Sequence, residues 1–402
     1  MRSDGKKKAG NCWFIVVFFV FCCYAGYGLL FDGEQQLSGV VDSGEAVACS
    51  VESMMDGSYQ SHLNTYFEEN FFGRKLLIRL RSQLLYSLCR VSPNENVVIG
   101  KERYLYEPMY IMFELQAYAP SSEEYFAELG ENLTRLRALL EENGKELYVF
   151  ISPSKAHYIR DKIPFRYELL SREGTFSREN HEELKKTLLQ NGICFFDSNE
   201  YIDANAKRYF SPLFYASGIH WSHVWGESAA AEFLNLINEQ SKWDLGEITV
   251  KEISSSEPIP PDTDLYDSLN LFSRPEEEWY GTQAELVREG EDKPNVFMRG
   301  SSFMGQSLSM LVNQGVFGRN VYFENYYYNT DEDSQYRYVS SNEAYDEVNM
   351  DRLMGQSDIL VIEVNDAGIY KTGMGLIEYL LANPEYMDDV YEDVILEEGE
   401  SA

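Results

Sequence analysis

A serine and a histidine in this sequence have the residue types and settings of an acyl-transferring pair. Ser302 lies in Gly300-Ser301-Ser302-Phe303, between a short apolar run, Asn295–Met298, and a helical pattern. His220 lies in Gly218-Ile219-His220-Trp221, in a predicted loop directly before another helical pattern. A histidine within hydrogen-bond reach activates a serine hydroxyl, and the free N–H groups at the start of a helix can hold an oxyanion. The two motifs therefore predict serine-based acyl transfer if the fold brings them together.

Each motif also has a purely structural explanation. Ser301 or Ser302 can cap the helix that follows, and a lone histidine beside an aromatic residue is usually structural. The other histidines are weaker candidates, because His62 begins a helix, His157 follows a strand end, and His181 falls in a charged helical pattern where we expect it to be solvated. None of the six cysteines has metal-ligand spacing with a histidine, so we expect no metal or organic cofactor.

The elements that would position Ser302 and His220 alternate between helix and strand. Helical patterns, with apolar residues three and four apart, cover residues 121–144, 177–191, 224–240 and 303–314. Apolar runs typical of buried strands are Leu147–Ile151, Ile193–Phe196, Asn295–Met298, Asn320–Phe323 and Asp358–Val364. This alternation predicts an α/β fold with a mostly parallel sheet flanked by helices on both faces. In such sheets the ligand cleft lies at the carboxyl ends of the strands.

The N-terminus predicts a membrane anchor. Lys6, Lys7 and Lys8 precede an uncharged stretch, residues 10–31, which is long enough to cross a hydrocarbon core of about 30 Å. The positive-inside rule places residues 1–9 in the cytoplasm and the rest of the chain outside. A cleaved signal peptide is the alternative, although no small-x-small cleavage site directly follows the stretch. We therefore predict a single-pass protein of the cell membrane with an extracytoplasmic domain.

The rest of the chain divides by composition. Residues 32–58 form a polar stalk, and residues 59–384 form the α/β domain, which begins with a helical pattern from Ser61 to Leu88. Residues 244–291, rich in Pro, Ser and acidic residues, predict a long surface insertion near the site, and residues 385–402 form an acidic tail. We find no internal repeat.

The chain is strongly acidic, with 66 Asp and Glu against 34 Lys and Arg and a formal net charge of −32. Such a surface repels nucleic acid and anionic lipid, so we expect no nucleic-acid partner. The charge is compatible with neutral glycans or with a basic partner. The 29 tyrosines fit either a carbohydrate cleft or ordinary core packing.

Six segments, taken in order, resemble motifs of the alginate O-acetyltransferase-like (DHHW-type) family, whose members have an SGNH-hydrolase fold. The histidine precedes the serine, which is the order of a permuted SGNH fold. No single motif decides, but the ordered series covers the chain from about residue 63 to about residue 370. The segments are Leu63–Arg74, Val98–Tyr106, Ile151–Lys155, Gly218–Trp221, Gly300–Phe303 and Glu363–Asp366.

The resemblance implies O-acetylation of a cell-surface or exported polysaccharide through an acetyl-serine intermediate. Ser302 would be the nucleophile and His220 the general base. A membrane-embedded acyltransferase would supply the acetyl groups, because this chain has only one predicted span. The other implied site residues are Gly300 and Asn365 at the oxyanion, and Lys155 and Trp221 at the substrate.

The sequence departs from the family pattern at the acid that should orient the histidine. The family motif has an Asp two residues before the histidine, and here that position is Gly218. The acid would then be Asp197, after another strand, or Asp262 or Asp264 from the predicted insertion. Alternatively, a backbone carbonyl orients the imidazole in a Ser–His dyad.

Two other functions stay open on the sequence alone. With water as the acceptor, the same pair of residues gives a glycan acetyl-esterase. Without a triad acid, the domain can be a non-catalytic glycan-binding or assembly subunit of an envelope complex. A separation of more than about 6 Å between Ser302 Oγ and His220, with no cleft between them, would argue against both enzymes.

Overall fold

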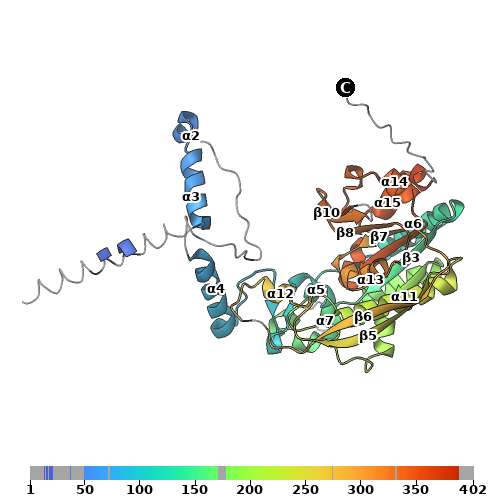
Figure 1. Ribbon diagram of the computed structural model, residues 1–402, viewed down its shortest axis with the longest axis horizontal. Helices are drawn as coiled ribbons and strands as arrows, with labels where there is room; N and C mark the ends of the chain where they lie inside the picture. Colours follow the sequence, from blue (N-terminus) through green and yellow to red (C-terminus); the bar gives the residue numbers. More distant parts are fainter. Residues whose placement is uncertain are drawn as a thin grey trace, which may run out of the picture. The chain divides into compact units, whose positions relative to one another are not determined.

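The computed structural model describes residues 49–388 apart from 71, 72, 171–177, 274, 331 and 332, together with residues 13, 15, 16, 18–20 and 37. It divides into two compact units (Figure 1). The smaller unit is Met1–Ile99 with Asp264–Pro275, and the larger unit is Gly100–Thr263 with Glu276–Ala402.

The smaller unit is mainly helical. The helical pattern predicted from Ser61 to Leu88 is two helices, which are interrupted at Gly73, a residue with φ of 87°. The described elements of this unit are α2 (Val51–Met55), α3 (Ser58–Asn70), α4 (Arg74–Leu84), a π-helical turn η1 (Leu85–Cys89), β1 (Val98–Ile99) and α12 (Asp264–Asp267).

The predicted anchor falls largely outside the described residues, as do most of the stalk and the end of the acidic tail. Within the part of the chain that the structure describes, no helix has the length and apolar character needed to cross a bilayer. The anchor therefore stays a prediction from the sequence.

The larger unit is built on a seven-stranded sheet with the order β10-β9-β8-β7-β11-β3-β4. The five strands from β8 to β4 run parallel, and β9 and β10 are antiparallel to their neighbours. The last strand in sequence, β11, lies in the middle between β7 and β3. The strands are β3 (Glu146–Ser152), β4 (Cys194–Asp197), β7 (Val296–Gly300), β8 (Asn320–Glu324), β9 (Tyr327–Thr330), β10 (Asp333–Tyr338) and β11 (Ile359–Asn365).

Helices cover both faces of this sheet, as the sequence predicts (Figure 1). On one face, Val149 and Ile151 of β3 join an apolar cluster with α6, α9, α14 and α15. On the other face, the ring of Phe150 lies 5.3 Å from that of Phe233 in α11. β3 and β11 are buried on both sides and are therefore apolar almost throughout. These helices are α6 (Glu123–Glu142), α9 (Glu179–Gln190), α11 (His223–Gln240), α14 (Met350–Gly355) and α15 (Leu376–Ala382).

Shorter elements connect this framework. The predicted helix over residues 303–314 is split, because Ser307 with φ of −133° and ψ of −86° separates a 3₁₀ turn, η4 (Ser302–Gln306), from α13 (Leu308–Asn313). The cap of α6 is Ser122, whose side chain accepts from Tyr125 N. The other elements are η2 (Lys101–Arg103), β2 (Leu105–Tyr106), α5 (Pro108–Glu114), α7 (Lys155–Tyr158), η3 (Arg160–Lys162), α8 (Phe165–Glu168), α10 (Ser198–Ala204), η5 (Tyr345–Glu347), η6 (Asp366–Lys371) and η7 (Pro384–Met387).

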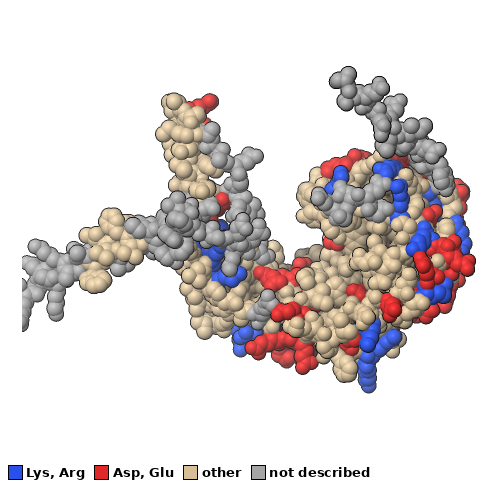
Figure 2. Space-filling model, in the orientation of Figure 1, with Lys and Arg blue, Asp and Glu red and all other residues tan. Residues whose placement is uncertain are grey.

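The segment predicted as an insertion at about 244–291 contains regular structure. Two long antiparallel strands, β5 (Gly246–Ser255) and β6 (Trp279–Glu289), form a ribbon. Residues 264–275, between them in the sequence, belong to the smaller unit. Acidic side chains are spread over the face of the larger unit that Figure 2 shows, in agreement with the net charge of the chain.

Candidate active site

Ser302 and His220 meet at the carboxyl edge of the sheet. Ser302 begins η4, directly after β7, and His220 lies in the loop that leads into α11. His220 Nε2 is 2.8 Å from Ser302 Oγ, and both side chains are partly buried. This is hydrogen-bond distance, so the imidazole is placed to accept the proton of the serine hydroxyl. The separation of 2.8 Å is well below the limit of about 6 Å beyond which both enzyme functions would be disfavoured.

The loop that carries His220 is held from below by Lys155. This side chain is fully buried, and its Nζ donates hydrogen bonds to the carbonyls of Tyr215 at 2.7 Å, Ala216 at 3.1 Å and Gly218 at 2.5 Å. A buried ammonium group needs several acceptors, and the loop carbonyls supply them. The predicted contact of Lys155 with substrate is therefore corrected, because the side chain points into the fold and positions the histidine loop.

Trp221 also has a structural position. Its side chain is fully buried, and Nε1 donates to the carbonyl of Phe303 at 3.2 Å. The residue after the base is thereby linked to the residue after the nucleophile. Because the indole ring has no exposed face, the predicted sugar contact of Trp221 is corrected to a role in joining the two loops.

Glu363 holds the serine turn from behind. One carboxylate oxygen accepts hydrogen bonds from Ser301 N at 2.6 Å and Ser301 Oγ at 2.8 Å, and the other accepts from Ser152 Oγ. Burial raises the pKa of Glu363 to about 7, although the hydrogen bonds from Ser152 and Ser301 oppose the rise. A Cβ at Gly300 would lie 2.6 Å from Glu363, so a glycine is required where the carboxylate meets the turn.

The two residues predicted at the oxyanion have other contacts. Asn365 donates from Nδ2 to Ser152 Oγ at 3.2 Å and to the carbonyl of Pro153 at 2.8 Å, and its Oδ1 accepts from Ala367 N. Asn365 therefore fastens β11 to the end of β3. Gly300 has no Cβ, which allows the turn to approach Glu363 closely. Ser302 is the first residue of η4, a position whose backbone N–H has no partner within the helix.

The triad acid is not Asp197. Its carboxylate contacts His181 Nε2 at 3.0 Å and Lys185 Nζ at 3.1 Å, and it accepts hydrogen bonds from Asn199. These partners occupy Asp197 at the end of β4, away from His220. Asp264 begins α12 in the smaller unit, where its carboxylate accepts from Leu265 N at 2.7 Å, and its role as an acid stays a prediction.

Two other acidic residues lie near the histidine loop. Glu324 ends β8, and its Cα is in register with that of Gly300 on β7. Burial raises the pKa of Glu324, and the charge of His220 opposes the rise, which places the two groups within electrostatic reach. Asp262 is buried, and its carbonyl accepts from the hydroxyl of Ser217 in the histidine loop at 3.2 Å.

The comparison with known families agrees with this geometry. The sequence model of the family described as "SGNH hydrolase-like domain, acetyltransferase AlgX" matches residues 97–310, a little more than half of the chain. The matched segment contains both His220 and Ser302. The chain belongs to this family. The resemblance to alginate O-acetyltransferase-like proteins that the sequence motifs predict is thereby confirmed.

Several solved structures are similar to this chain. The O-acetyltransferase domain of Pseudomonas putida AlgJ is 13% identical with a TM-score of 0.47, covering 72% of this chain and 99% of that one. Pseudomonas aeruginosa AlgX is 16% identical with a TM-score of 0.43, covering 70% and 66%. Bacillus cereus PatB1 is 10% identical with a TM-score of 0.40, covering 68% and 97%. No curated protein sequence matches the chain significantly.

The positions of several residues around this site could not be predicted from the sequence. Glu363 was visible only as part of a family-like motif, and its bond to the serine turn depends on β11 lying beside β7. Glu324 has no motif of its own, and only the register of β7 and β8 reveals its position. His181, predicted to be solvated, is 3% exposed and lies between Asp366 and Asp197. The sequence held one signal for it, since both aspartates follow predicted strands.

Proposed function

We propose that this chain is an extracytoplasmic O-acetyltransferase that transfers acetyl groups to hydroxyls of a cell-surface or exported polysaccharide through Ser302. The observation that carries the proposal is the 2.8 Å contact between Ser302 Oγ and His220 Nε2, inside a segment that matches an acetyltransferase family. A charged nucleophile or metal is not needed for this chemistry, because a serine with a base suffices.

The reaction would run in two balanced halves. In the first, Ser302 Oγ forms a bond to the acetyl carbon of the donor as the bond to the donor's leaving group breaks. The proton of the hydroxyl passes to His220 Nε2 and then to the leaving group. In the second, a sugar hydroxyl gives its proton to His220 and attacks the acetyl carbon, the bond to Ser302 breaks, and the serine takes the proton back.

The surroundings of the pair support each half. A negative charge on Glu324 or Asp262 would stabilise the imidazolium that forms when His220 holds the proton. The N–H at the start of η4 would donate to the developing oxyanion. Lys155 and Glu363 hold the two loops, so that the pair needs no rearrangement before the reaction.

The location and the partner belong to the same proposal. An anchor at residues 10–31 would keep the domain at the outer side of the membrane, near nascent glycan. A membrane-embedded acyltransferase would supply acetyl groups, since a single span cannot itself form a path for a donor. The acidic surface favours neutral glycan over nucleic acid as the acceptor class.

Trapping of the acetyl-enzyme tests the proposal. Full-length protein treated with p-nitrophenyl acetate should gain one acetyl group on the peptide that contains Ser302, seen by mass spectrometry. Ser302→Ala should abolish the label, and Ser309→Ala, a nearby serine that donates to the carbonyl of Gly305, should leave it unchanged. Absence of label on Ser302 in the wild type would exclude both acyl-transfer functions.

The fate of the acetyl group then separates the transferase from the esterase. Polysaccharide from a strain deleted for this chain would be de-O-acetylated and offered to the acetyl-enzyme. Appearance of sugar acetyl esters at a rate above acetate release supports the transferase. Acetate release that no sugar diminishes would identify water as the acceptor.

A further inference from the structure

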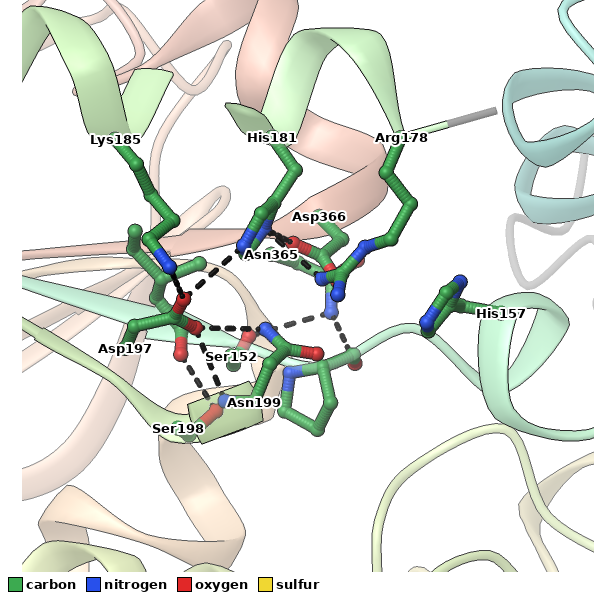
Figure 3. A network of polar contacts seen from close by, with 12 residues as sticks. Ser152, His157, Arg178, His181, Lys185, Asp197, Ser198, Asn199, Asn365 and Asp366 are labelled. Atoms are coloured by element: carbon green, nitrogen blue, oxygen red, sulfur yellow. Dashed lines mark hydrogen bonds and ion pairs between the residues drawn. The ribbon is translucent and has the colours of Figure 1, made fainter. Parts of the chain in front are cut away.

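A second group of polar side chains lies at the same edge of the sheet as Ser302 and takes no part in the proposed acetyl transfer. Figure 3 shows Arg178, His181 and Lys185 pointing from α9 and its cap toward Asp197, which ends β4, and Asp366, which follows β11. His181 Nδ1 contacts Asp366 at 2.6 Å, and His181 Nε2 contacts Asp197 at 3.0 Å. Burial opposes protonation of His181, but the two carboxylates outweigh it and raise its pKa to about 9. The imidazolium and its two carboxylates thus form a fixed, charged floor.

A small cavity of about 40 Å³ that opens to solvent lies over this floor. Ser154 follows β3 and Asp366 follows β11, so the cavity lies at the carboxyl ends of neighbouring central strands. Ligands of open α/β sheets bind at this edge, where the strand order reverses. The other side of the cavity is formed by α5, which contributes Tyr110, Phe113 and Glu114.

Arg178 lines the cavity, and its contacts with described residues use only the Nη2 donor of its guanidinium group. Its Nη2 contacts Asp366 Oδ2 at 2.9 Å and His181 Nδ1 at 3.0 Å. Within the described residues, Nε and Nη1 donate no hydrogen bond. Ser154, also at the cavity, is 3% exposed, and its buried hydroxyl has no hydrogen-bond partner there. Buried polar groups are normally satisfied, so the buried hydroxyl of Ser154 beside the cavity points to a polar ligand.

The side chain of Phe303 lies between the cavity residue Tyr110 and the catalytic residue His220. The ring of Tyr110 lies 5.9 Å from that of Phe303, and the ring of Phe303 lies 4.8 Å from that of His220. Phe303 directly follows Ser302. A ligand seated against Tyr110 would therefore lie close enough to belong to the same chain as a group that reacts at Ser302.

We propose that this cavity is an acceptor subsite that binds one sugar unit of the glycan next to the unit being acetylated. This proposal rests on the proposed function. Tyr110 and Phe113 offer ring surface, and Arg178 and Glu114 offer planar, charged groups that bind neighbouring hydroxyls in pairs. The lining charges have both signs, with Arg178 and His181 against Glu114, Glu179 and Asp366, which suits a hydroxyl-rich ligand without strong charge.

The substitutions for a test change side chains that line the cavity. Arg178→Lys retains a cation beside Asp366 but loses the fork of donors. Glu114→Gln keeps the shape of the side chain, which also contacts His157 at 3.1 Å. Lys185→Gln is the matched control, because Lys185 belongs to the same network through Asp197 but does not line the cavity. Melting temperatures identify any variant that fails to fold, and Phe113→Leu then serves as a further cavity variant.

Two rates are measured for each variant of the full-length protein. The first is formation of acetyl-Ser302 from p-nitrophenyl acetate, which does not need the cavity. The second is transfer to oligosaccharides cut from the de-O-acetylated polysaccharide of a deletion strain. Losing a charge-assisted hydrogen bond should raise the KM for oligosaccharide about ten- to a hundredfold in Arg178→Lys and Glu114→Gln. Acetyl-Ser302 formation should stay within about twofold of the wild type, and Lys185→Gln should leave the KM for oligosaccharide unchanged.

The outcomes separate the subsite from the proposed function. If acetyl-Ser302 forms and the cavity variants keep the wild-type KM, the subsite proposal is wrong and the acetyltransferase stands. An equal rise in KM in Lys185→Gln would also overturn it, because the effect would then come from the network. If acetyl-Ser302 never forms, the acetyltransferase proposal fails. Direct titration of the same oligosaccharide into wild type and Arg178→Lys still decides the subsite, because equal affinity of the two proteins refutes it.

Discussion

Gly226 of α11 and Gln306 of η4 approach each other so closely that a Cβ at residue 226 would lie 2.0 Å from the carbonyl oxygen of Gln306. The first of these residues follows His220 by six positions, and the second follows Ser302 by four. The glycine therefore sets how near the helix after the base can come to the turn that carries the nucleophile. The contact is with backbone, so no side-chain rotation can relieve it.

Replacing Gly226 with Ala should separate the catalytic pair. The helix and the turn must move apart, and a misplacement of about 1 Å can cost on the order of a hundredfold in rate. We expect acetyl-Ser302 formation from p-nitrophenyl acetate to fall by about that factor, with a loss of about 1–3 kcal/mol in the free energy of unfolding. Gly305→Ala is the control, because a Cβ there meets its nearest atom at 3.9 Å. Equal rates in both variants would contradict this role of Gly226.

Substitution of the two carboxylates near His220 should identify the acid that stabilises its protonated form. Glu324→Gln and Asp262→Asn each remove one charge with little change in shape. The variant that loses the acid should lose about 10²- to 10⁴-fold in kcat/KM and move the low-pH limb of the profile to lower pH, because the imidazolium is then less stable. If neither variant changes the profile, the predicted acid Asp264 or a backbone carbonyl orients the ring, and Asp264→Asn separates these two cases. Adding Gly218→Asp to the impaired variant should restore part of the rate.

Glu363 should make folding stability depend on pH below neutrality. Its pKa is raised from 4.5 to about 7 in the folded protein, so the native state holds an extra proton between these values. Its contribution to stability is therefore greatest below about pH 4.5 and declines as the pH rises toward 7, by about 3 kcal/mol at most. Chemical denaturation of wild type and Glu363→Gln across this range should show the decline only in the wild type. A constant difference between the two proteins would refute it.

His181 should make folding stability depend on pH above neutrality. Its pKa rises from 6.5 to about 9 in the folded protein, so its favourable pairing with Asp366 and Asp197 is complete below about pH 6.5. The stabilisation is lost as the pH rises through 9, by up to about 3 kcal/mol. His181→Gln should be less stable than the wild type at pH 6.5 and should approach it at pH 9.5. Parallel stability curves for the two proteins across this range would exclude a titrating imidazolium.

The framework of this fold could be predicted from the sequence because its signals are local. Apolar runs such as Leu147–Ile151 and the three-and-four spacing over residues 121–144 each specify an element without reference to the rest of the chain. The pairing of His220 with Ser302 could be anticipated from the order of family motifs, and the structure places the two atoms in contact.

The charged residues of the interior could not be predicted in this way. Lys155 was expected at the substrate, and its burial becomes clear only when the carbonyls of residues 215, 216 and 218 surround its ammonium group. The residues beside His181 in the sequence are mostly charged, which predicts a solvated side chain. Its partner Asp366 lies 185 positions away in the sequence, so local patterns do not reveal the contact. Whether a charged side chain is solvated or buried depends on partners that only the tertiary fold supplies.

The position of β11 determines when the Ser302–His220 pair can form during folding. This strand follows both β3 and β7 in the sequence, yet it is the only link between them in the sheet that the structure describes. A nascent chain lacking it would hold the histidine and the serine on two unjoined groups of strands. The pair of Ser302 and His220 should therefore form only once β11 has joined the two groups of strands, so that activity arises in one step late in folding.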